Sequence, residues 1–171
     1  SAKTMALQSG QVDLVENITN VSDIQDFKDN PDFTVDIASG VRCGFSWMNF
    51  DGVLGNKTLR QAILMAIDYD TICHSKTIGD LYTPGFSVLP STLNYGYDKL
   101  NNPYTYDPEG AKKLLDDAGI VDTDGDGIRE IDGENINLHY VSYENRLLND
   151  FSNAHIQYLA EIGIGCTADY G

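Results

Sequence analysis

A pair of amphipathic helices joined by a long irregular connection constrains the fold of this chain most strongly. The first helix is predicted over residues 57–68. Its apolar residues recur at helical spacing, at Leu59, Ala62, Ile63, Ala66 and Ile67. Because side chains at i, i+3, i+4, i+7 and i+8 share one face of an α-helix, this segment should bury a single apolar stripe in a core.

The second helix is predicted between Asp107 and Gly119. Asp107 suits the N-cap, Pro108 suits the first helical position, and Gly119 suits the position just past the end. The buried face should consist of Ala111, Leu114, Leu115 and Ala118. Both helices therefore follow from local chemistry alone.

Residues 79–106, between the two helices, are rich in proline and tyrosine and show neither a helical nor a strand period. Irregular segments of this length usually serve a function or wrap the surface of their own domain. We expect most of these tyrosines to pack on the domain that carries them, with one or two reaching a ligand cleft.

Short strands and helices alternate in the rest of the chain. Helices are expected over residues 5–9, around 20–27 and from about 146 to 162, and strands over 12–15, 33–37, 45–50, 137–143 and 164–170. Such alternation indicates an α/β fold with a mixed β-sheet flanked by helices. At 171 residues and 42% hydrophobic content, residues 1–171 are expected to form a single domain.

The charge balance excludes some partners. With 26 acidic and 11 basic residues, the formal net charge is −15. Nucleic acids and anionic membrane surfaces select for lysine and arginine patches, so neither is expected as a partner. No run of roughly 18 apolar residues, the length needed to cross a bilayer, occurs in the sequence.

Enzymatic signatures are missing from the sequence. It contains no G-x-S-x-G elbow, no glycine-rich phosphate loop and no H-E-x-x-H metal motif. Cys43, Cys73 and Cys166 have a spacing that fits no zinc or redox motif, and each is expected to be a small apolar core residue. We therefore expect a protein that is not an enzyme.

The segment from Asp122 to Glu130 is the sharpest local motif. Asp122, Asp124 and Asp126, followed by a glycine, match the front half of an EF-hand calcium loop. The twelfth position, which should hold a bidentate glutamate, is Gly133. Asp-Gly steps also make good turns between a helix and a strand. A turn and a Ca²⁺ site with these three aspartates as ligands both remain open, and no other cofactor is expected.

Four segments together resemble one known family. In order they are M-A-L-x-S-G-x-V-D-L, L-R-Q-A-I-x-x-A-I-D, Y-D-P-E-x-A-K-K-L-L-x-x-A-G and D-T-D-G-D-G-I-R-E. Their order and spacing resemble the family 5 extracellular solute-binding proteins, the oligopeptide-, dipeptide- and nickel-binding components of ABC transporters. The resemblance implies a lobe of the type II periplasmic-binding-protein kind, namely the C-terminal ligand-binding lobe of a larger bacterial protein with two lobes.

The resemblance also implies a function. The parent protein would capture peptides outside the membrane, either in the periplasm or as a lipoprotein anchored to the cell surface, and deliver them to an ABC permease. Its expected partners are the N-terminal lobe of the same protein, the permease, and a peptide or small metal-chelate ligand. A nickel-binding protein of the same family is the first alternative. A calcium-dependent structural or adhesion module is the alternative from another class, followed by a hydrolase.

Arg146 and Trp47 are the candidate ligand-binding residues. Arg146 follows a predicted strand and precedes a predicted helix, at the edge where α/β folds place their sites. Relatives in the family carry an arginine in an x-x-R-P-x segment, where it pairs with the ligand carboxylate, although Leu147 stands here in place of the proline. A guanidinium binds a carboxylate in bidentate fashion, but a surface arginine at a helix start is equally consistent. Trp47 could stack on a ligand or fill the core.

Overall fold

The computed structural model describes residues 1–93 and 95–171, and for Arg146 it describes the backbone alone. The α-helices are α1 (Ala2–Gln8), α2 (Val21–Lys28), α3 (Lys57–Ala66), α4 (Tyr69–Cys73), α5 (Pro108–Asp117) and α6 (Arg146–Glu161). The strands are β1 (Glu130–Ile131), β2 (Glu134–Asn135), β3 (Asn137–Ser142) and β4 (Gly165–Tyr170). Short 3₁₀ turns occur at Val53–Gly55 and Tyr97–Lys99.

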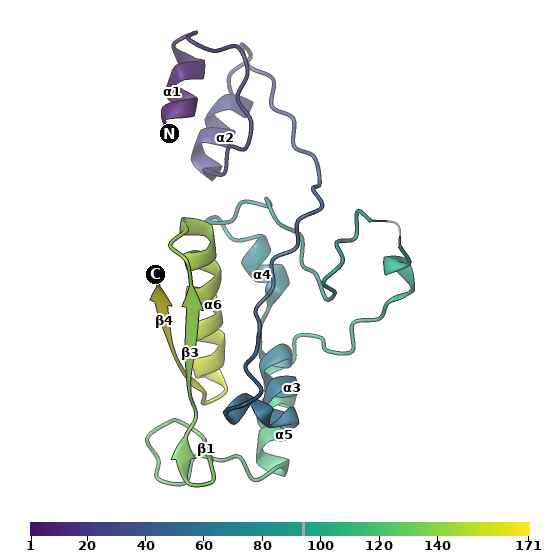
Figure 1. The fold of residues 1–171 in the computed structure, drawn as a ribbon, viewed down its shortest axis with the longest axis vertical. Helices are drawn as coiled ribbons and strands as arrows, with labels where there is room; N and C mark the ends of the chain where they lie inside the picture. Colours follow the sequence, from purple (N-terminus) through teal and green to yellow (C-terminus); the bar gives the residue numbers. More distant parts are fainter. Residues whose placement is uncertain (94) are drawn as a thin grey trace.

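Helices α3 and α5 pack side by side and confirm the strongest sequence prediction (Figure 1). Asn56 caps α3 by accepting a hydrogen bond from the backbone N–H of Leu59 at 3.1 Å. Asp107 caps α5 in the same way through Gly110, and Pro108 occupies the first turn. The apolar stripes face each other, and Leu59, Ala62, Ala111 and Leu115 have 0% exposure. Leu114 is partly buried, but the prediction that Ala118 belongs to the buried face is wrong, because Ala118 is the exposed C-cap residue.

A parallel pair of strands with a long crossover helix forms the other half of the core. Strands β3 and β4 pair in parallel, from Asn137 opposite Gly165 to Ser142 opposite Tyr170, and α6 connects them. Helix α6 lies against both strands (Figure 1). Leu159 and Ile162 at its end join the same hydrophobic cluster as α3 and α5. The predicted strands and helix of this C-terminal unit are therefore confirmed.

A tight hairpin leads into this unit. Strands β1 and β2 pair antiparallel around Asp132 and Gly133, which have φ values of 57° and 81°. Two successive residues with positive φ match the twist of a two-residue hairpin, and Asp-Gly is a favoured pair for such a turn. The backbone N–H of Ile136 then donates to the carbonyl of Arg129 at 2.8 Å, which joins the hairpin to the start of β3.

Three predicted strands are wrong. Residues 12–15, 33–37 and 45–50 form no strand, and the described strands make one parallel and one antiparallel pair instead of a single mixed sheet. A strand is stable only when a neighbouring strand takes up its backbone hydrogen bonds, and no described strand pairs with these three segments. The N–H of Phe33 bonds instead to the carbonyl of Asn30, three residues earlier in the chain. Several of the apolar side chains in these three segments remain exposed, with Leu14 at 85% and Ile37 at 52%.

Residues 79–106, the irregular segment that leads into α5, contact the core mainly near the two ends of the segment. Tyr82 packs edge-to-face on Phe151 of α6, and Tyr106 packs on Tyr158 of the same helix. Its middle stands away from the helices (Figure 1), and Tyr95 is 79% exposed. The expectation that most tyrosines pack on their own domain therefore holds for the two ends of this segment.

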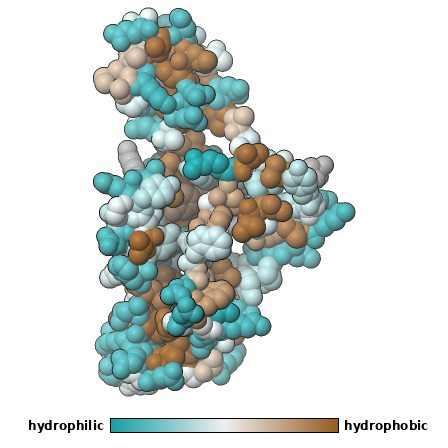
Figure 2. All heavy atoms as spheres, in the orientation of Figure 1, coloured by the Kyte–Doolittle hydropathy of each residue, from teal (hydrophilic) through white to brown (hydrophobic). Residues whose placement is uncertain are grey.

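Apolar side chains also remain on the surface. Figure 2 shows them over the N-terminal helices α1 and α2, which stand apart from the main core in Figure 1, and over the connection between α3 and α5. The exposed residues in these two regions are Met5, Val12, Leu14, Phe86, Val88, Leu89 and Leu100. No helix among the described residues has the length and apolar character needed to cross a membrane.

Candidate functional site

The carboxyl ends of β3 and β4 and the first turn of α6 meet at one edge of the molecule. Both strands run toward the end of the structure where α2 lies, and α6 starts there and runs back (Figure 1). Arg146 is the first residue of α6, as the sequence predicts for a strand-to-helix junction. Its side chain lies outside the described part of the structure, so its contact with a ligand stays a prediction.

The side chain of Asn145 caps the first turn of α6. The Asn145 side-chain oxygen accepts hydrogen bonds from the backbone N–H groups of Leu147 and Leu148, at 3.1 and 3.4 Å. The helix runs for 16 residues, so its aligned peptide dipoles place partial positive charge at this end. This end of α6 therefore favours anionic groups such as a carboxylate.

Tyr170 ties β4 to α6 beside this edge. Its hydroxyl lies 2.7 Å from Oγ of the fully buried Ser152 and 3.3 Å from Oδ1 of Asn153. The backbone N–H of Gly171 donates to the carbonyl of Ser142, which extends the strand pairing to the same edge. These contacts hold the strand ends against the helix and so give the edge a defined shape.

Trp47 lies on the surface of this chain. Its side chain is 85% exposed, stands on irregular chain instead of a strand, and contacts Phe45 edge-to-face with ring centroids 4.9 Å apart. Its segment passes along β3, because Oγ of Ser46 lies 3.0 Å from the hydroxyl of Tyr140. The indole thus does not fill the core of this chain, and ligand stacking remains a prediction.

His155 is buried among aromatic rings. It is 7% exposed on α6, with the rings of Tyr69 and Tyr140 edge-to-face at 5.4 and 6.0 Å. Its Nε2 has no hydrogen-bond partner among the described residues. Burial lowers the pKa of His155 to about 4 and raises the pKa of Tyr69 to about 12, with Tyr140 adding to the latter shift. The imidazole is therefore neutral at pH 7.

The Asp122–Glu130 loop is built as a series of turns. The Asp122 carboxylate accepts hydrogen bonds from the backbone N–H groups of Gly125 and Gly127, at 2.7 and 2.8 Å. These bonds stabilise the ionised form and lower the pKa of Asp122. Asp124 accepts from the N–H of Asp126. The backbone of the loop is thus satisfied by its own side chains, as expected for a turn.

The carboxylates of this loop nevertheless form a group that differs from the predicted one. Oxygen atoms of Asp122, Asp124 and Glu130 lie within 4.8 Å of one another, whereas Asp126 accepts a hydrogen bond from Asn135 instead. Glu130 is 8% exposed and accepts from the backbone and hydroxyl of Thr123. An all-oxygen set suits a hard cation such as Ca²⁺, although Ca²⁺ needs about 6–8 ligands.

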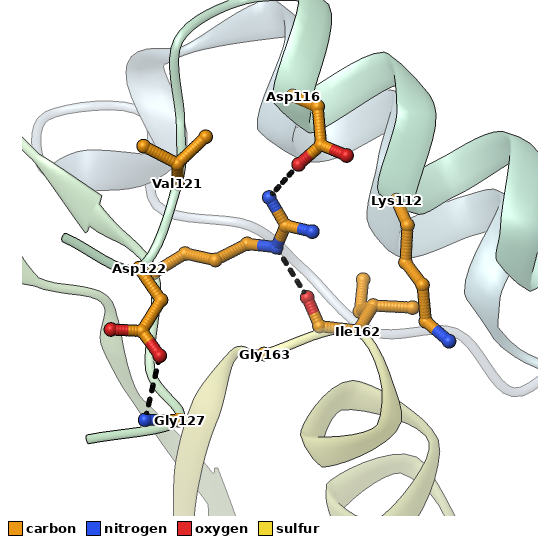
Figure 3. Close-up of a pocket in the computed structure, with 8 residues that line it drawn as sticks. Lys112, Asp116, Val121, Asp122, Gly127, Ile162 and Gly163 are labelled. Atoms are coloured by element: carbon orange, nitrogen blue, oxygen red, sulfur yellow. Dashed lines mark hydrogen bonds and ion pairs between the residues drawn. The ribbon is translucent and has the colours of Figure 1, made fainter. Parts of the chain in front are cut away.

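Arg129 connects the Asp122–Glu130 loop to the core through hydrogen bonds. Its Nη1 donates to the Asp116 carboxylate and to the carbonyl of Ile120, both at 2.6 Å, and its Nε donates to the carbonyl of Ile162 at 2.9 Å. Figure 3 shows the bonds to Asp116 and Ile162. The side chain lines a pocket of about 340 Å³ between α5, the loop and the end of α6. Gly163 has a φ of 78°, and a Cβ there would approach Cγ of Arg129 at 3.1 Å. Arg129, the penultimate residue of the motif, therefore has a structural role, and its three hydrogen bonds are called the Arg129 clasp below.

The sequence matches the family described as "Bacterial extracellular solute-binding proteins, family 5 Middle" over residues 1–169. It is 29% identical over 119 residues to the oligopeptide-binding protein AppA of Bacillus subtilis, which covers 69% of this chain and 22% of that protein. It is also 32% identical over 114 residues to the heme-binding protein A of Haemophilus influenzae, covering 66% of this chain and 20% of that protein. The chain thus spans about a fifth of the length of these curated relatives.

Solved structures show the same fold. NikA from Brucella suis, in complex with Fe(III)-EDTA, superposes with a TM-score of 0.81 at 18% identity, over 99% of this chain and 35% of that one. AppA from Bacillus subtilis, in complex with a nonapeptide, gives a TM-score of 0.76 at 23% identity, over 99% of this chain and 34% of that one. The predicted α/β class and its relation to type II periplasmic binding proteins are confirmed. The chain belongs to the family 5 bacterial extracellular solute-binding proteins.

Proposed function

We propose that the protein to which this chain belongs is the substrate-binding component of an ABC importer that captures peptides outside the membrane. The observation that carries this proposal is the family match over residues 1–169, together with the similarity to an oligopeptide-binding protein. In this role the protein binds and releases its ligand without covalent chemistry.

The edge formed by β3, β4 and α6 is the proposed ligand-binding face of this chain. The dipole of α6 and the guanidinium of Arg146 both favour an anion, and a peptide ends in a carboxylate. Trp47 and Phe45 offer an exposed pair of aromatic rings for a ligand side chain. A peptide held at this edge would be recognised through its carboxyl terminus.

The proposed ligand-binding unit, called the two-lobe clamp below, consists of two lobes of one protein. This chain supplies the C-terminal lobe, and an N-terminal lobe of the same protein closes over the ligand by a hinge motion. Tighter binding to the closed form would shift the population toward it and allow the permease to recognise the loaded state. The proposed location is outside the cytoplasmic membrane, in the periplasm or anchored by a lipid.

A metal chelate is the second candidate ligand of the same site. NikZ from Campylobacter jejuni, solved in complex with Ni(L-His), has a TM-score of 0.72 to this chain at 22% identity. A chelate of this kind carries carboxylate groups, so Arg146 could serve both ligand classes.

Ca²⁺ binding by Asp122, Asp124 and Glu130 is a separate proposal. Carboxylate oxygens of these three residues lie within 4.8 Å of one another, which supports this proposal. In that case the ion would stabilise the loop next to the Arg129 clasp instead of taking part in ligand capture.

Native mass spectrometry of the full-length protein, purified without added ligand, tests the function. A ladder of adducts with the masses of short peptides supports the peptide proposal, and a single adduct of nickel with a small chelator supports the alternative. Replacement of Arg146 by alanine should then deplete the adducts, while Arg42→Ala, which removes an exposed arginine far along the sequence, should leave them unchanged. Adducts that match neither class would refute both proposals.

A further inference from the structure

Aspartate is followed directly by glycine at four places in this chain. The four steps are Asp51–Gly52, Asp124–Gly125, Asp126–Gly127 and Asp132–Gly133. The backbone nitrogen of the second residue can attack the aspartyl carboxyl group, and glycine permits this best because it has no Cβ to hinder the approach. The four steps share this chemistry but differ in how the fold holds the two reacting groups.

In the acidic loop after α5, hydrogen bonds hold both reacting groups. The N–H groups of Gly125 and Gly127 donate to the Asp122 carboxylate at 2.7 and 2.8 Å, and Figure 3 shows the bond from Gly127. The carboxylates of Asp124 and Asp126 also accept hydrogen bonds from backbone N–H groups of the loop. Groups held in this way react only after the loop opens locally.

The Asp132–Gly133 step is held by its backbone conformation. Its two residues have φ values of 57° and 81°, and strands β1 and β2 pair on either side of it. To bring the Gly133 nitrogen onto the carboxyl carbon, the backbone of Asp132 must rotate away from this turn conformation, which would break the hairpin pairing. This step should therefore react more slowly than an unconstrained one.

The Asp51–Gly52 step lies in irregular chain before the 3₁₀ turn at Val53–Gly55. Both of its residues are exposed. Among the described residues, no hydrogen bond involves the Asp51 carboxylate or the N–H of Gly52. Arg146, whose side chain is not described, begins α6 at the opposite end of the core from this turn (Figure 1). Both reacting groups of this step are therefore accessible.

We propose that Asp51 is the site at which this chain spontaneously forms isoaspartate. The Gly52 nitrogen forms a bond to Cγ of Asp51, and the carboxyl hydroxyl leaves with the amide proton as water. Water then adds to the backbone carbonyl of Asp51 in the resulting five-membered imide, and the bond from that carbonyl to the nitrogen breaks. The chain now continues through Cγ, so the backbone gains one carbon while the composition is unchanged.

The extra backbone carbon would enter a packed turn. Cζ of Arg60 lies 4.4 Å from the ring centroid of Phe50, and Nη1 of Arg60 donates to the carbonyls of Leu54 and Gly55 at 2.7 and 2.9 Å. These contacts fix Phe50 relative to the turn that precedes α3. A longer backbone at Asp51 should loosen the stacking of Phe50 on Arg60 and lower the melting temperature of the chain.

Peptide mapping of the stored chain tests this proposal. Trypsin places the Asp51 step, the two loop steps and the hairpin step in separate peptides, residues 43–57, 114–129 and 130–146. After several weeks at neutral pH below the melting temperature, peptide 43–57 should contain at least about tenfold more isoaspartate than peptide 114–129, because a loop step reacts only after a hydrogen bond to a carboxylate opens. In concentrated urea all four steps should react at similar rates, since their sequence chemistry is the same.

Two variants separate the chemistry from the fold. Gly52→Ala should lower isoaspartate at residue 51 severalfold without loss of folding, because its backbone is extended and a Cβ there meets no atom within 4 Å. Asp122→Ala removes the acceptor of Gly125 and Gly127 and should raise isoaspartate in peptide 114–129 toward its level in urea. If Asp122→Ala fails to fold by circular dichroism, the comparison of the native chain with and without urea decides.

Three outcomes would overturn the proposal. Equal isoaspartate in the three peptides of the native chain would show that the fold does not select Asp51. A higher content in peptide 114–129 or 130–146 than in peptide 43–57 would place the site elsewhere. Isoaspartate at Asp51 that forms in urea but not in the native chain would show that the turn protects this step.

Discussion

Removing the Arg129 side chain should destabilise this chain, because its three hydrogen bonds are lost together. The guanidinium is 13% exposed and donates three hydrogen bonds that link α5, the residues after it and the end of α6. In Arg129→Ala all three are lost at once. The carbonyl oxygens of Ile120 and Ile162 then lose their donor, while Asp116 keeps access to water at 55% exposure.

The expected loss in the free energy of unfolding follows from the surroundings of these three acceptors. A hydrogen bond from a charged donor contributes about 1.5–3 kcal/mol, and two such bonds go to backbone carbonyls. The ion pair to Asp116 contributes only about 0–1 kcal/mol, because that carboxylate is solvated. Water that enters the pocket beside Arg129 will recover part of the loss. We therefore expect a loss of about 2–4 kcal/mol in the free energy of unfolding.

Urea unfolding followed by circular dichroism measures this loss. With a slope of about 2 kcal/mol per molar urea, Arg129→Ala should lower the unfolding midpoint by about 1–2 M. Asp116→Ala is the matched control and should cost at most about 1 kcal/mol, since it removes only the solvated partner. Arg129→Lys keeps the charge but cannot span three acceptors, so it should fall between the two.

One result would refute the reasoning. If Arg129→Ala and Asp116→Ala have equal effects below about 1 kcal/mol, the carbonyl bonds contribute little and the clasp is only a surface ion pair. The loop would then be held to the core by its backbone alone, through the N–H of Arg129 and the carbonyl of Gly163 at 2.8 Å.

Four further predictions concern pH, calcium, fluorescence and ligand binding. The pKa of His155 is about 4 in the folded chain, below the ordinary value of 6.5 expected in the unfolded chain. The free energy of unfolding should therefore be highest above pH 6.5 and fall by about 3 kcal/mol as the pH drops toward 4, because the unfolded chain takes up the proton first; His155→Phe should remove this part of the pH dependence in acid titrations followed by circular dichroism. Asp122→Ala should lower the melting temperature, because it removes two backbone hydrogen bonds of the loop. The proposed Ca²⁺ site predicts that added Ca²⁺ raises the melting temperature of the native chain and that EDTA reverses the rise; a melting temperature independent of Ca²⁺ would refute the site. Acrylamide should quench the fluorescence of Trp47, the only tryptophan of this chain, and bound peptide should reduce this quenching in the full-length protein. If peptide leaves the quenching unchanged, Trp47 does not contact the ligand. This chain alone should bind peptides weakly or not at all, so micromolar or tighter binding in calorimetry would contradict the two-lobe clamp.

Local sequence chemistry was sufficient for most of the described helices, although it did not predict α4 (Tyr69–Cys73). The apolar spacing in residues 57–66, the caps at Asn20, Asn56 and Asp107, and the proline that opens α5 act within one or two turns, so their effects can be read without knowing the rest of the fold. The Asp-Gly turns of residues 122–127 and 132–133 belong to the same class. Family membership was also accessible from the sequence, because the diagnostic segments lie on these local elements.

Strands and site chemistry depended on distant residues. Residues 137–142 became a strand because residues 165–170 pair with them, whereas the equally alternating residues 33–37 have no described partner and stay irregular. Pairing is a property of two segments, so alternation in one of them cannot establish it.

Tertiary packing alone decided how several side chains are used. The burial of His155 requires Tyr69 and Tyr140 from other elements, and the clasp of Arg129 requires carbonyls from both sides of its pocket. Glu130 joins Asp122 and Asp124 only because the hairpin turns it inward. The sequence by itself determined the helices, the turns and the family, since these depend on neighbours along the chain; the pairing of strands, the burial of charges and the grooves were decided by the fold, because they depend on neighbours in space.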